Sequence, residues 1–389
     1  MNDIHLGTYK DKNVYYDTNE AMNGHITTTG KSGSGKSVFN QKLILQIAKN
    51  EGSVLAISIH GTLKTSEIFG MFREEFLTYI KTIDAYNEGL SCPLFGSSIG
   101  IYDDKERINR IGEVTEVISR AYDLKSRQTA CLRKAVAEVY DRGGYHVDGV
   151  RAVADVLRDM DTNISENILE KMFMMFEHNV FRDGPFFLDR KKITITDLDG
   201  YDELTQHAVA EMILSYIWRM AVAGEFKKEK LHVFIDEAQN LSFAKGSTLE
   251  KMLTEGRKMG INLMLATQYV EKNSKMSKLL NQSDLQVFFH PARNEIRETA
   301  SIIDPARADE WTVTLKALEV GEFVAVGPLK VDGICTRGPL RIDSRYIKGC
   351  DEEAMTLVSD ADAKKSISEH MVSDRGKRYR RIIVQTSSK

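Results

Sequence analysis

The run from Gly30 to Ser37 constrains this chain more than any other stretch, because it reads Gly-Lys-Ser-Gly-Ser-Gly-Lys-Ser. It matches the phosphate-binding pattern G-x-x-x-x-G-K-[ST] without a gap. The β-branched run Ile26–Thr29 precedes it and predicts a strand, and a helical pattern opens at Ser37. A strand, a glycine-rich loop and a helix in this order predict a P-loop, whose backbone N–H groups point at a phosphate chain. A glycine-rich loop without a ligand is the alternative.

The side chains of the predicted P-loop have defined chemistry. Lys36 would reach the β- and γ-phosphates of a nucleotide, and the Ser37 hydroxyl would ligate Mg²⁺. We therefore expect ATP and Mg²⁺ as ligands. The predicted nucleotide-binding residues are Gly30, Lys31, Ser32, Gly33, Ser34, Gly35, Lys36, Ser37 and Val38.

Length and charge limit the possible classes of protein. The 389 residues exceed one usual compact domain, which predicts a large core with an insertion or a second lobe. The net charge of -3 argues against a protein that coats nucleic acid over its whole surface, but it allows a local basic pore. The N-terminus lacks a secretory pattern and no run of ~18 apolar residues occurs, so we expect a cytoplasmic protein that touches a membrane only through a partner.

The cysteines are interpreted as buried or incidental thiols in a reducing compartment, because their spacing shows no pairs. They are Cys92, Cys131, Cys335 and Cys350.

Hydrophobic patterning predicts an α/β core with a mostly parallel sheet. The near-continuous apolar run Val54–Ile59 is typical of a strand buried on both faces, as parallel sheets require. A helix is expected at about Thr248–Met259, and Gly260 would end it. Further strands are expected at Ile4–Gly7, Val14–Asp17, Lys192–Leu198, Leu231–Glu237, Ile261–Gln268, Leu285–Phe289 and Phe323–Val326.

From about Ser97 to Phe187 the pattern changes to amphipathic helices. Ile111, Val114 and Ile118 recur at helical spacing, and Ile164–Phe181 is predicted to be another helix. Its methionines and phenylalanines are interpreted as the core of a helix bundle rather than a ligand pocket. The expected domains are 1–95 and 188–345 as two parts of the core, 96–187 as an inserted helical lobe, and 346–389 as a tail with a basic stretch at 375–381.

Two carboxylates end the predicted strand at Leu231–Glu237. Ligands of open parallel sheets gather at the carboxyl ends of the strands, where the P-loop is also expected. Asp236 could hold the Mg²⁺ that Ser37 ligates, and Glu237 could polarise the attacking water. The alternative is an acidic pair that caps the next helix.

Gln268 ends a neighbouring predicted strand, and its amide could orient water or contact the γ-phosphate; a polar strand end without function is the alternative. A phosphoryl-transfer site also gains from a cation that another subunit supplies. Arg257, Arg293 and Arg297 are the candidates in this half of the chain, and spacing alone does not choose between them.

Three lysines follow Gln268 at intervals of three, namely Lys272, Lys275 and Lys278. They could place a basic stripe in a DNA-binding pore, or they could be a solvated helix face.

These residues together resemble the HerA–FtsK superfamily of hexameric P-loop motors, which includes DNA translocases and conjugative-transfer ATPases. The resemblance runs from Leu6 to about Gly327. Leu6-Gly7, Val14, Asp17 and His25, followed by the P-loop, are similar to the FtsK approach to this loop. Phe234–Leu241 is more similar to HerA and the conjugative ATPases.

The same resemblance extends to later segments. Glu255–Ile261 and Leu265–Gln268 are similar to the family's segment that carries a trans-acting arginine and a sensor glutamine. It implies that Arg257 is the arginine finger. The segment from Val287 to Ala300 resembles the next strand and helix of the family, which implies that Arg297 is a second interface arginine.

The sequence departs from the family at two places. His60-Gly61 follows the second core strand where many members carry an acidic residue and a lysine. Because the P-loop begins at Gly30, we expect neither an N-terminal barrel nor a membrane anchor, and targeting would come from a partner.

The resemblance implies a RecA-like α/β P-loop ATPase that forms a ring, most simply a hexamer, and moves double-stranded DNA. Two alternatives remain open at this point. One is a conjugation or secretion ATPase that moves protein. The other is a nucleotide-gated scaffold that controls an effector such as a nuclease, for example in phage defence.

Overall fold

The computed structural model describes residues 3–95, 104–143, 149–178, 180–182, 184–269 and 274–345. Two stretches with sequence predictions, the tail at 346–389 and Lys272, lie outside these residues. The strands of the main sheet are β1 (Ile4–Tyr9), β2 (Lys12–Tyr16), β3 (Ile26–Thr29), β4 (Ser53–Ser58), β5 (Ile80–Asp84), β8 (Ile193–Asp197), β9 (Leu231–Ile235), β10 (Ile261–Thr267), β11 (Leu285–Phe289), β12 (Glu322–Val326), β13 (Leu329–Val331), β14 (Ile334–Thr336) and β15 (Leu340–Asp343).

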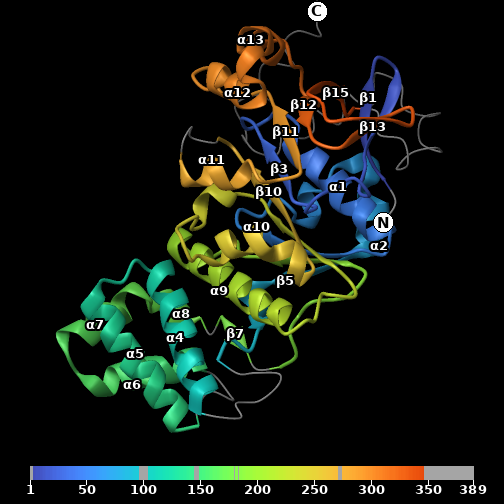
Figure 1. Ribbon diagram of the computed structural model, residues 1–389. Helices are drawn as coiled ribbons and strands as arrows, with labels where there is room; N and C mark the ends of the chain where they lie inside the picture. The colour runs from blue at the N-terminus through green and yellow to red at the C-terminus, as the bar shows by residue number, and fades with distance from the viewer. Residues whose placement is uncertain are drawn as a thin grey trace, which may run out of the picture.

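Helices cover both faces of this sheet and form a lobe at one end of it (Figure 1). They are α1 (Lys36–Lys49), α2 (Arg73–Tyr79), α3 (Ala85–Glu88), α4 (Asp104–Ala121), α5 (Ser126–Asp141), α6 (Gly149–Met160), α7 (Asn163–Lys171), α8 (Phe173–Glu177), α9 (Glu203–Val222), α10 (Thr248–Met259), α11 (Lys275–Leu280), α12 (Ile296–Ile303) and α13 (Ala308–Lys316). A second, two-stranded sheet pairs β6 (Leu90–Ser91) with β7 (Phe181–Arg182).

The main sheet combines a parallel part with an antiparallel part. Among the described residues its order is β14-β13-β2-β1-β15-β12-β11-β3-β10-β9-β4-β8-β5. All pairs from β11 to β5 are parallel, whereas the pairs from β14 to β11 are antiparallel. The P-loop strand β3 therefore lies inside the parallel part, between β11 and β10, with its carboxyl end at the edge where β9 and β10 also end.

Alternating side chains of the parallel strands enter two separate hydrophobic cores. In β4, Leu55 and Ile57 join the core under α9 and α10, while Val54 and Ala56 join the core under α1. Every residue of β4 is buried, which confirms the prediction drawn from its continuous apolar run. A third, smaller core packs α12 and α13 against β11 and β12.

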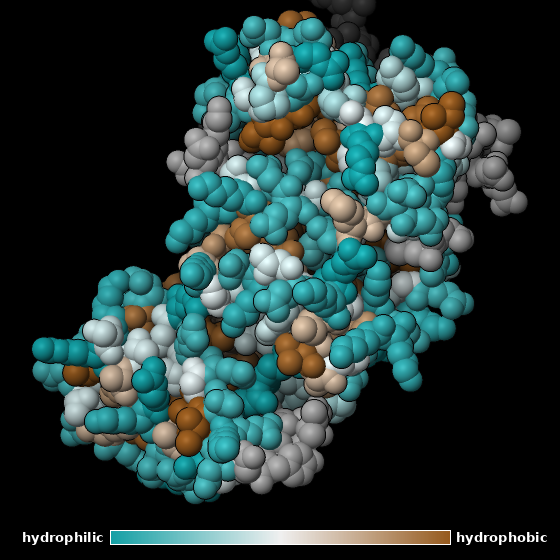
Figure 2. Space-filling model, in the orientation of Figure 1, coloured by the Kyte–Doolittle hydropathy of each residue, from teal (hydrophilic) through white to brown (hydrophobic). Residues whose placement is uncertain are grey.

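The helices α4–α8 lie between β6 and β7 in the chain and form the lobe at the lower left of Figure 1. Their buried residues, such as Val114, Leu132 and Met175, belong to the same core as those of α9. The lobe thus packs on the face that α9 and α10 cover, away from α12 and α13. Figure 2 shows a mostly hydrophilic face, with hydrophobic residues gathered just below α12 and α13.

One of the predicted helices differs from the structure. The expected helix Ile164–Phe181 is two shorter helices, α7 and α8, followed by the strand β7. Met172 ends one helix and precedes the next with φ −102° and ψ 15°, and its side chain is buried. The chain bends there so that apolar residues on both sides of the bend reach the core. The prediction of a helical core is confirmed for Met172, Met175 and Phe176, which are buried, and is wrong for Phe173, which is 59% exposed at the start of α8.

Candidate nucleotide-binding site

The P-loop lies where the sequence predicts it, between β3 and α1. Gly35 begins the helix from the left-handed region with φ 104°, which a residue with a side chain rarely adopts. A Cβ on Gly30 would lie 2.6 Å from the Phe289 Cβ, and one on Gly35 would lie 2.8 Å from the Gly321 N. The loop is therefore packed tightly against β11 and the segment before β12. The first turn of α1 presents backbone N–H groups that have no partner within the helix.

Lys36 folds over its own loop. Its Nζ donates to the Gly30 carbonyl and, at 3.2 Å, to the Lys31 carbonyl. Burial lowers the pKa of the Lys36 ammonium, and the negative charge of Glu237 opposes that shift. Lys36 thus lies at the loop with the strand-end carboxylate within electrostatic reach. Ser37, in the first turn of α1, is exposed, and Val38 is half-buried.

Asp236 follows the last residue of β9 and is buried. Its carboxylate accepts hydrogen bonds from the Thr62 Oγ1 at 2.6 Å, the Ile59 N–H at 3.0 Å and the Ser58 Oγ at 3.5 Å. Burial raises the pKa of Asp236, and the donors from Thr62 and Ile59 counteract part of that shift. The three donors belong to the end of β4 and the turn after it, and they fix the orientation of the carboxylate.

Glu237 and Gln268 are in direct contact. The Gln268 Nε2 donates to the Glu237 Oε1 at 3.1 Å, and the Gln239 side chain donates to the other carboxylate oxygen. The strand β10 lies between β3 and β9, with Thr267 opposite Thr29. Gln268 therefore lies at the edge of the sheet where the P-loop begins. Its hydrogen bond to Glu237 connects the ends of β10 and β9 at that edge.

His25 joins the P-loop strand to α10. Its imidazole is 1% exposed, and the Nδ1 accepts the backbone N–H of Leu263 at 2.9 Å. Burial lowers the pKa of His25 to about 4, while a contact with the Leu253 backbone opposes the shift. A Cβ on Gly256 would lie 3.3 Å from the imidazole Cε1, so this glycine lets the helix approach the ring.

Arg257 is the next residue, in the last turn of α10, and its side chain is exposed. Arg297 lies on α12, also exposed, with an ion pair to Asp309 at 3.5 Å. Arg293 is exposed in the segment before α12. Within the described segments of a single chain, none of these three arginines contacts Glu237 or Gln268. Of the lysine stripe, Lys275 and Lys278 are exposed on α11.

A model of the AAA-like domain family matches residues 12–304, which include the P-loop, Asp236, Glu237 and Gln268. This chain belongs to the AAA-like domain family. It is a P-loop ATPase of the HerA–FtsK superfamily, as the sequence resemblance implies.

Two relatives of this AAA-like ATPase come from Methanocaldococcus jannaschii. The probable helicase MJ1565 is 23% identical over 380 residues, which cover 88% of this chain and 67% of the relative. The probable DNA double-strand break repair helicase HerA is 33% identical over 107 residues, which cover 27% of this chain and 20% of the relative. The matches thus span only part of both relatives.

Solved structures share the fold of the ATPase. VirB4 of Thermoanaerobacter pseudethanolicus has a TM-score of 0.64 at 18% identity, over 87% of this chain and 95% of that chain. The plasmid coupling protein TrwB in complex with ADP and Mg²⁺ has a TM-score of 0.56 at 14% identity, over 83% of this chain and 86% of that chain. The expected RecA-like α/β fold is therefore confirmed.

The donor set of the ATPase suits a nucleotide that brings its own metal ion. The described residues hold no group of three or more His, Cys, Asp or Glu side chains that could bind a metal. Mg²⁺ is commonly held by one or two protein ligands plus phosphate oxygens and water. Ser37 and Asp236 are side chains of the right kind for that arrangement.

Sequence reasoning missed Thr62 and Lys64, which follow the unusual His60-Gly61 pair. Thr62 donates to Asp236, and the Lys64 Nζ binds Asp199 at 2.5 Å and Asp197 at 3.7 Å. A hydroxyl and a lysine within the turn that follows a buried parallel strand were the available signal, because such turns lie at the ligand edge of the sheet.

None of the helices in the described ranges is both long and apolar enough to cross a membrane.

Proposed function

We propose that this ATPase is a ring-forming DNA translocase of the HerA–FtsK type, most simply a hexamer, that binds ATP between neighbouring subunits. The observation that supports it best is the position of Arg257. This arginine is exposed in the last turn of α10, and the described residues of its own chain give its side chain no hydrogen-bond or ion-pair partner. A neighbouring subunit is therefore the natural site of its action.

In the proposed reaction, one subunit supplies the binding and hydrolytic groups. Lys36 binds the terminal phosphates, and Mg²⁺ held through Ser37 and Asp236 would neutralise the phosphate charge. Glu237 accepts a proton from the attacking water, and Gln268, hydrogen bonded to Glu237 at 3.1 Å, orients that water. Arg257 of the next subunit would stabilise the charge that develops on the γ-phosphate, and Arg297 is a second interface candidate.

DNA is the proposed cargo, most simply double-stranded. Two curated relatives are named as probable helicases, and one of them as a DNA repair helicase. Lys275 and Lys278 are exposed on α11, the next helix after β10 and Gln268. These two lysines would form a basic surface of the pore, so that a change at the site could be transmitted to the DNA.

Mixing two inactive variants tests whether Arg257 acts in trans. Lys36→Ala removes the phosphate contact, and Arg257→Ala removes the proposed finger, so each protein alone should have little ATPase activity. When they are mixed, a subunit with an intact P-loop can meet a neighbour with an intact Arg257, and part of the activity should return. Lys258→Ala, an exposed neighbour on the same turn, is the matched control and should retain turnover. If the mixed variants assemble properly but show no ATPase activity, the proposal that the site is shared between subunits is contradicted.

A further inference from the structure

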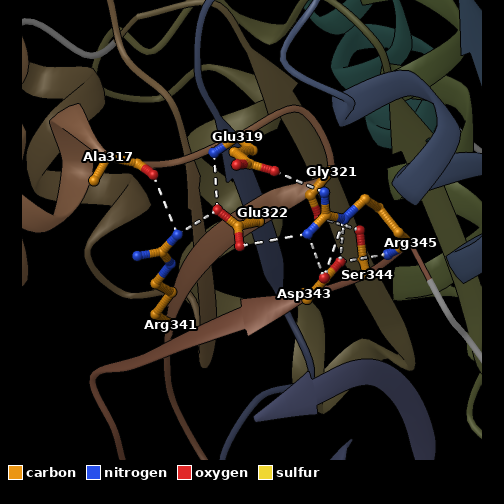
Figure 3. Close-up of polar contacts among 8 residues, drawn as sticks. All are labelled: Ala317, Glu319, Gly321, Glu322, Arg341, Asp343, Ser344 and Arg345. Atoms are coloured by element: carbon orange, nitrogen blue, oxygen red, sulfur yellow. Dashed lines mark hydrogen bonds and ion pairs between the residues drawn. The ribbon is translucent and has the colours of Figure 1, made fainter. Parts of the chain in front are cut away.

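The loop before β12 is fastened to the far side of the P-loop. The Gly321 N–H donates to the Ser34 carbonyl at 3.0 Å. The Gly321 carbonyl in turn accepts the Ser344 N–H at 3.0 Å and the Ser344 hydroxyl at 2.6 Å (Figure 3). The Lys42 Nζ, on α1, reaches the Ser344 carbonyl at 3.3 Å. The end of β15 is therefore held against both the P-loop and the helix that follows it.

The order of strands in the sheet places the region around Gly321 and Ser344 on the side of β3 opposite Glu237 and Gln268. Glu237 and Gln268 follow β9 and β10, on one side of β3. Gly321 directly precedes β12 and Ser344 directly follows β15, on the opposite side of β3. A nucleoside triphosphate that lies along the P-loop with its γ-phosphate towards Glu237 would direct its nucleoside towards this second side.

Arg345 presents an unusual surface there. Its guanidinium binds Asp343 through Nε at 2.9 and 3.0 Å and through a terminal nitrogen at 2.6 Å, and it binds Glu319 at 2.8 Å. Glu322 adds an ion pair at 3.7 Å. These carboxylates raise the pKa of Arg345 and occupy the edges of the guanidinium, as Figure 3 shows. Its side chain nevertheless stays 44% exposed.

Two neighbours add to this surface. A Cβ on Gly321 would lie 2.9 Å from the Arg345 Cγ, so the arginine stem crosses the glycine that touches the P-loop. Val320 precedes that glycine, and 66% of its surface is exposed. A planar cation whose edges are already bound, next to an exposed apolar side chain, is suited to contact a flat aromatic ring rather than a phosphate.

We propose that Val320, Gly321 and Arg345 form the wall that binds the nucleoside of the ATP, with the purine base stacked on the Arg345 guanidinium. This inference rests on the proposed nucleotide site and adds its specificity. Glu319, Glu322 and Asp343 repel phosphate from the wall, which leaves the triphosphate to Lys36. The ligand class is a nucleoside triphosphate, and the wall contributes nothing to the binding of a bare polyphosphate.

Titration calorimetry of the full chain with MgATP and with magnesium tripolyphosphate separates the two ends of the ligand. Arg345→Ala should weaken ATP binding about 10-fold, the order expected for one stacking contact, and leave tripolyphosphate affinity within about 2-fold of wild type. Arg345→Lys should behave like Arg345→Ala, because lysine keeps the charge but has no planar face. Arg341→Ala is the matched control, since Arg341 binds the same Glu322 at 2.6 Å but reaches Ala317 instead of Gly321. It should leave both affinities unchanged.

Other results would overturn the inference. Unchanged ATP affinity in Arg345→Ala, or equal losses for ATP and tripolyphosphate, would show that the arginine does not contact the base. If Arg345→Ala does not fold, Val320→Ala at the exposed neighbour replaces it, with an expected loss of about 2- to 5-fold for ATP alone. Equal ATP affinity of Val320→Ala and wild type would then refute the wall. If wild type binds neither ligand, the nucleotide site itself is wrong, which is a distinct outcome.

Discussion

The buried imidazole of His25 predicts how the stability of the core depends on pH. Its folded-state pKa is lowered to about 4 by burial, whereas a histidine in the unfolded chain titrates near ~6.5. The folded state therefore favours the neutral ring. The stability that depends on this neutral ring is fully present above the pKa of the unfolded chain and is lost as the pH falls towards 4. At pH 5 the difference spans about 1.5 pH units, or about 2 kcal/mol of unfolding free energy.

The test compares wild type with His25→Gln by urea unfolding at pH 7 and at pH 5. Glutamine keeps an acceptor for the Leu263 N–H but does not titrate, so its own cost should be similar at both pH values. The fall in unfolding free energy from pH 7 to pH 5 should be about 2 kcal/mol smaller in the variant. His232, whose pKa burial also lowers to about 4, should give a second effect of the same sign and similar size in His232→Gln. An identical pH dependence in wild type and His25→Gln would refute the reasoning.

Three further predictions concern the site and the packing around it. Lys36→Ala should abolish nucleotide binding, whereas Glu237→Gln should still bind nucleotide but not hydrolyse it. Binding of a fluorescent nucleotide and release of phosphate measure the two effects. Equal results for both variants would contradict the roles proposed for Lys36 and Glu237. Thr62→Val should lower turnover about 10-fold or more at limiting Mg²⁺, because a hydrogen bond to a charged group contributes ~1.5–3 kcal/mol, and Thr62→Ser should retain activity. Gly260→Ala should lower the unfolding free energy by about 3 kcal/mol or more, because its φ is 80° and a Cβ would lie 2.0 Å from the Phe226 carbonyl oxygen. The control is Gly246→Ala, where φ is 81° but no atom lies near the added Cβ. In the same denaturation assay it should lower the unfolding free energy by only about 1 kcal/mol.

The sequence predicts most of the parallel core because its inner strands carry their own hydrophobic signal, whereas the parallel strand β5 at the end of the sheet, Ile80–Asp84, is largely polar and was not predicted. Val54–Ser58 and Leu231–Ile235 are buried on both faces, and the P-loop reads directly from its glycines and lysine. The antiparallel strands β13 and β14 carry no such signal. Each has three residues, and β14 is largely exposed, so only pairing with β2 and with each other defines them.

The sequence predicts those residues of the site that are recognisable from their own position in a motif, but not the contacts between distant segments that orient them. Asp236 and Glu237 stand out at the end of an apolar strand, but the hydrogen bond from Thr62 spans 174 positions in sequence. The Arg345 cluster likewise joins the end of β15 to the loop before β12, 26 positions away at Glu319. Contacts of this kind depend on the order of strands in the sheet, which local patterns do not specify.

Steady-state ATP hydrolysis with and without long duplex DNA, at low and moderate salt, tests most directly the proposal that turnover of this ATPase moves DNA. Wild type and Glu237→Gln are compared under the same conditions. The account predicts that duplex DNA stimulates wild type, that the stimulation fades as salt rises, and that Glu237→Gln shows none. Turnover that requires Glu237 but is indifferent to DNA at every salt concentration would contradict it and would favour protein cargo or a partner-gated effector.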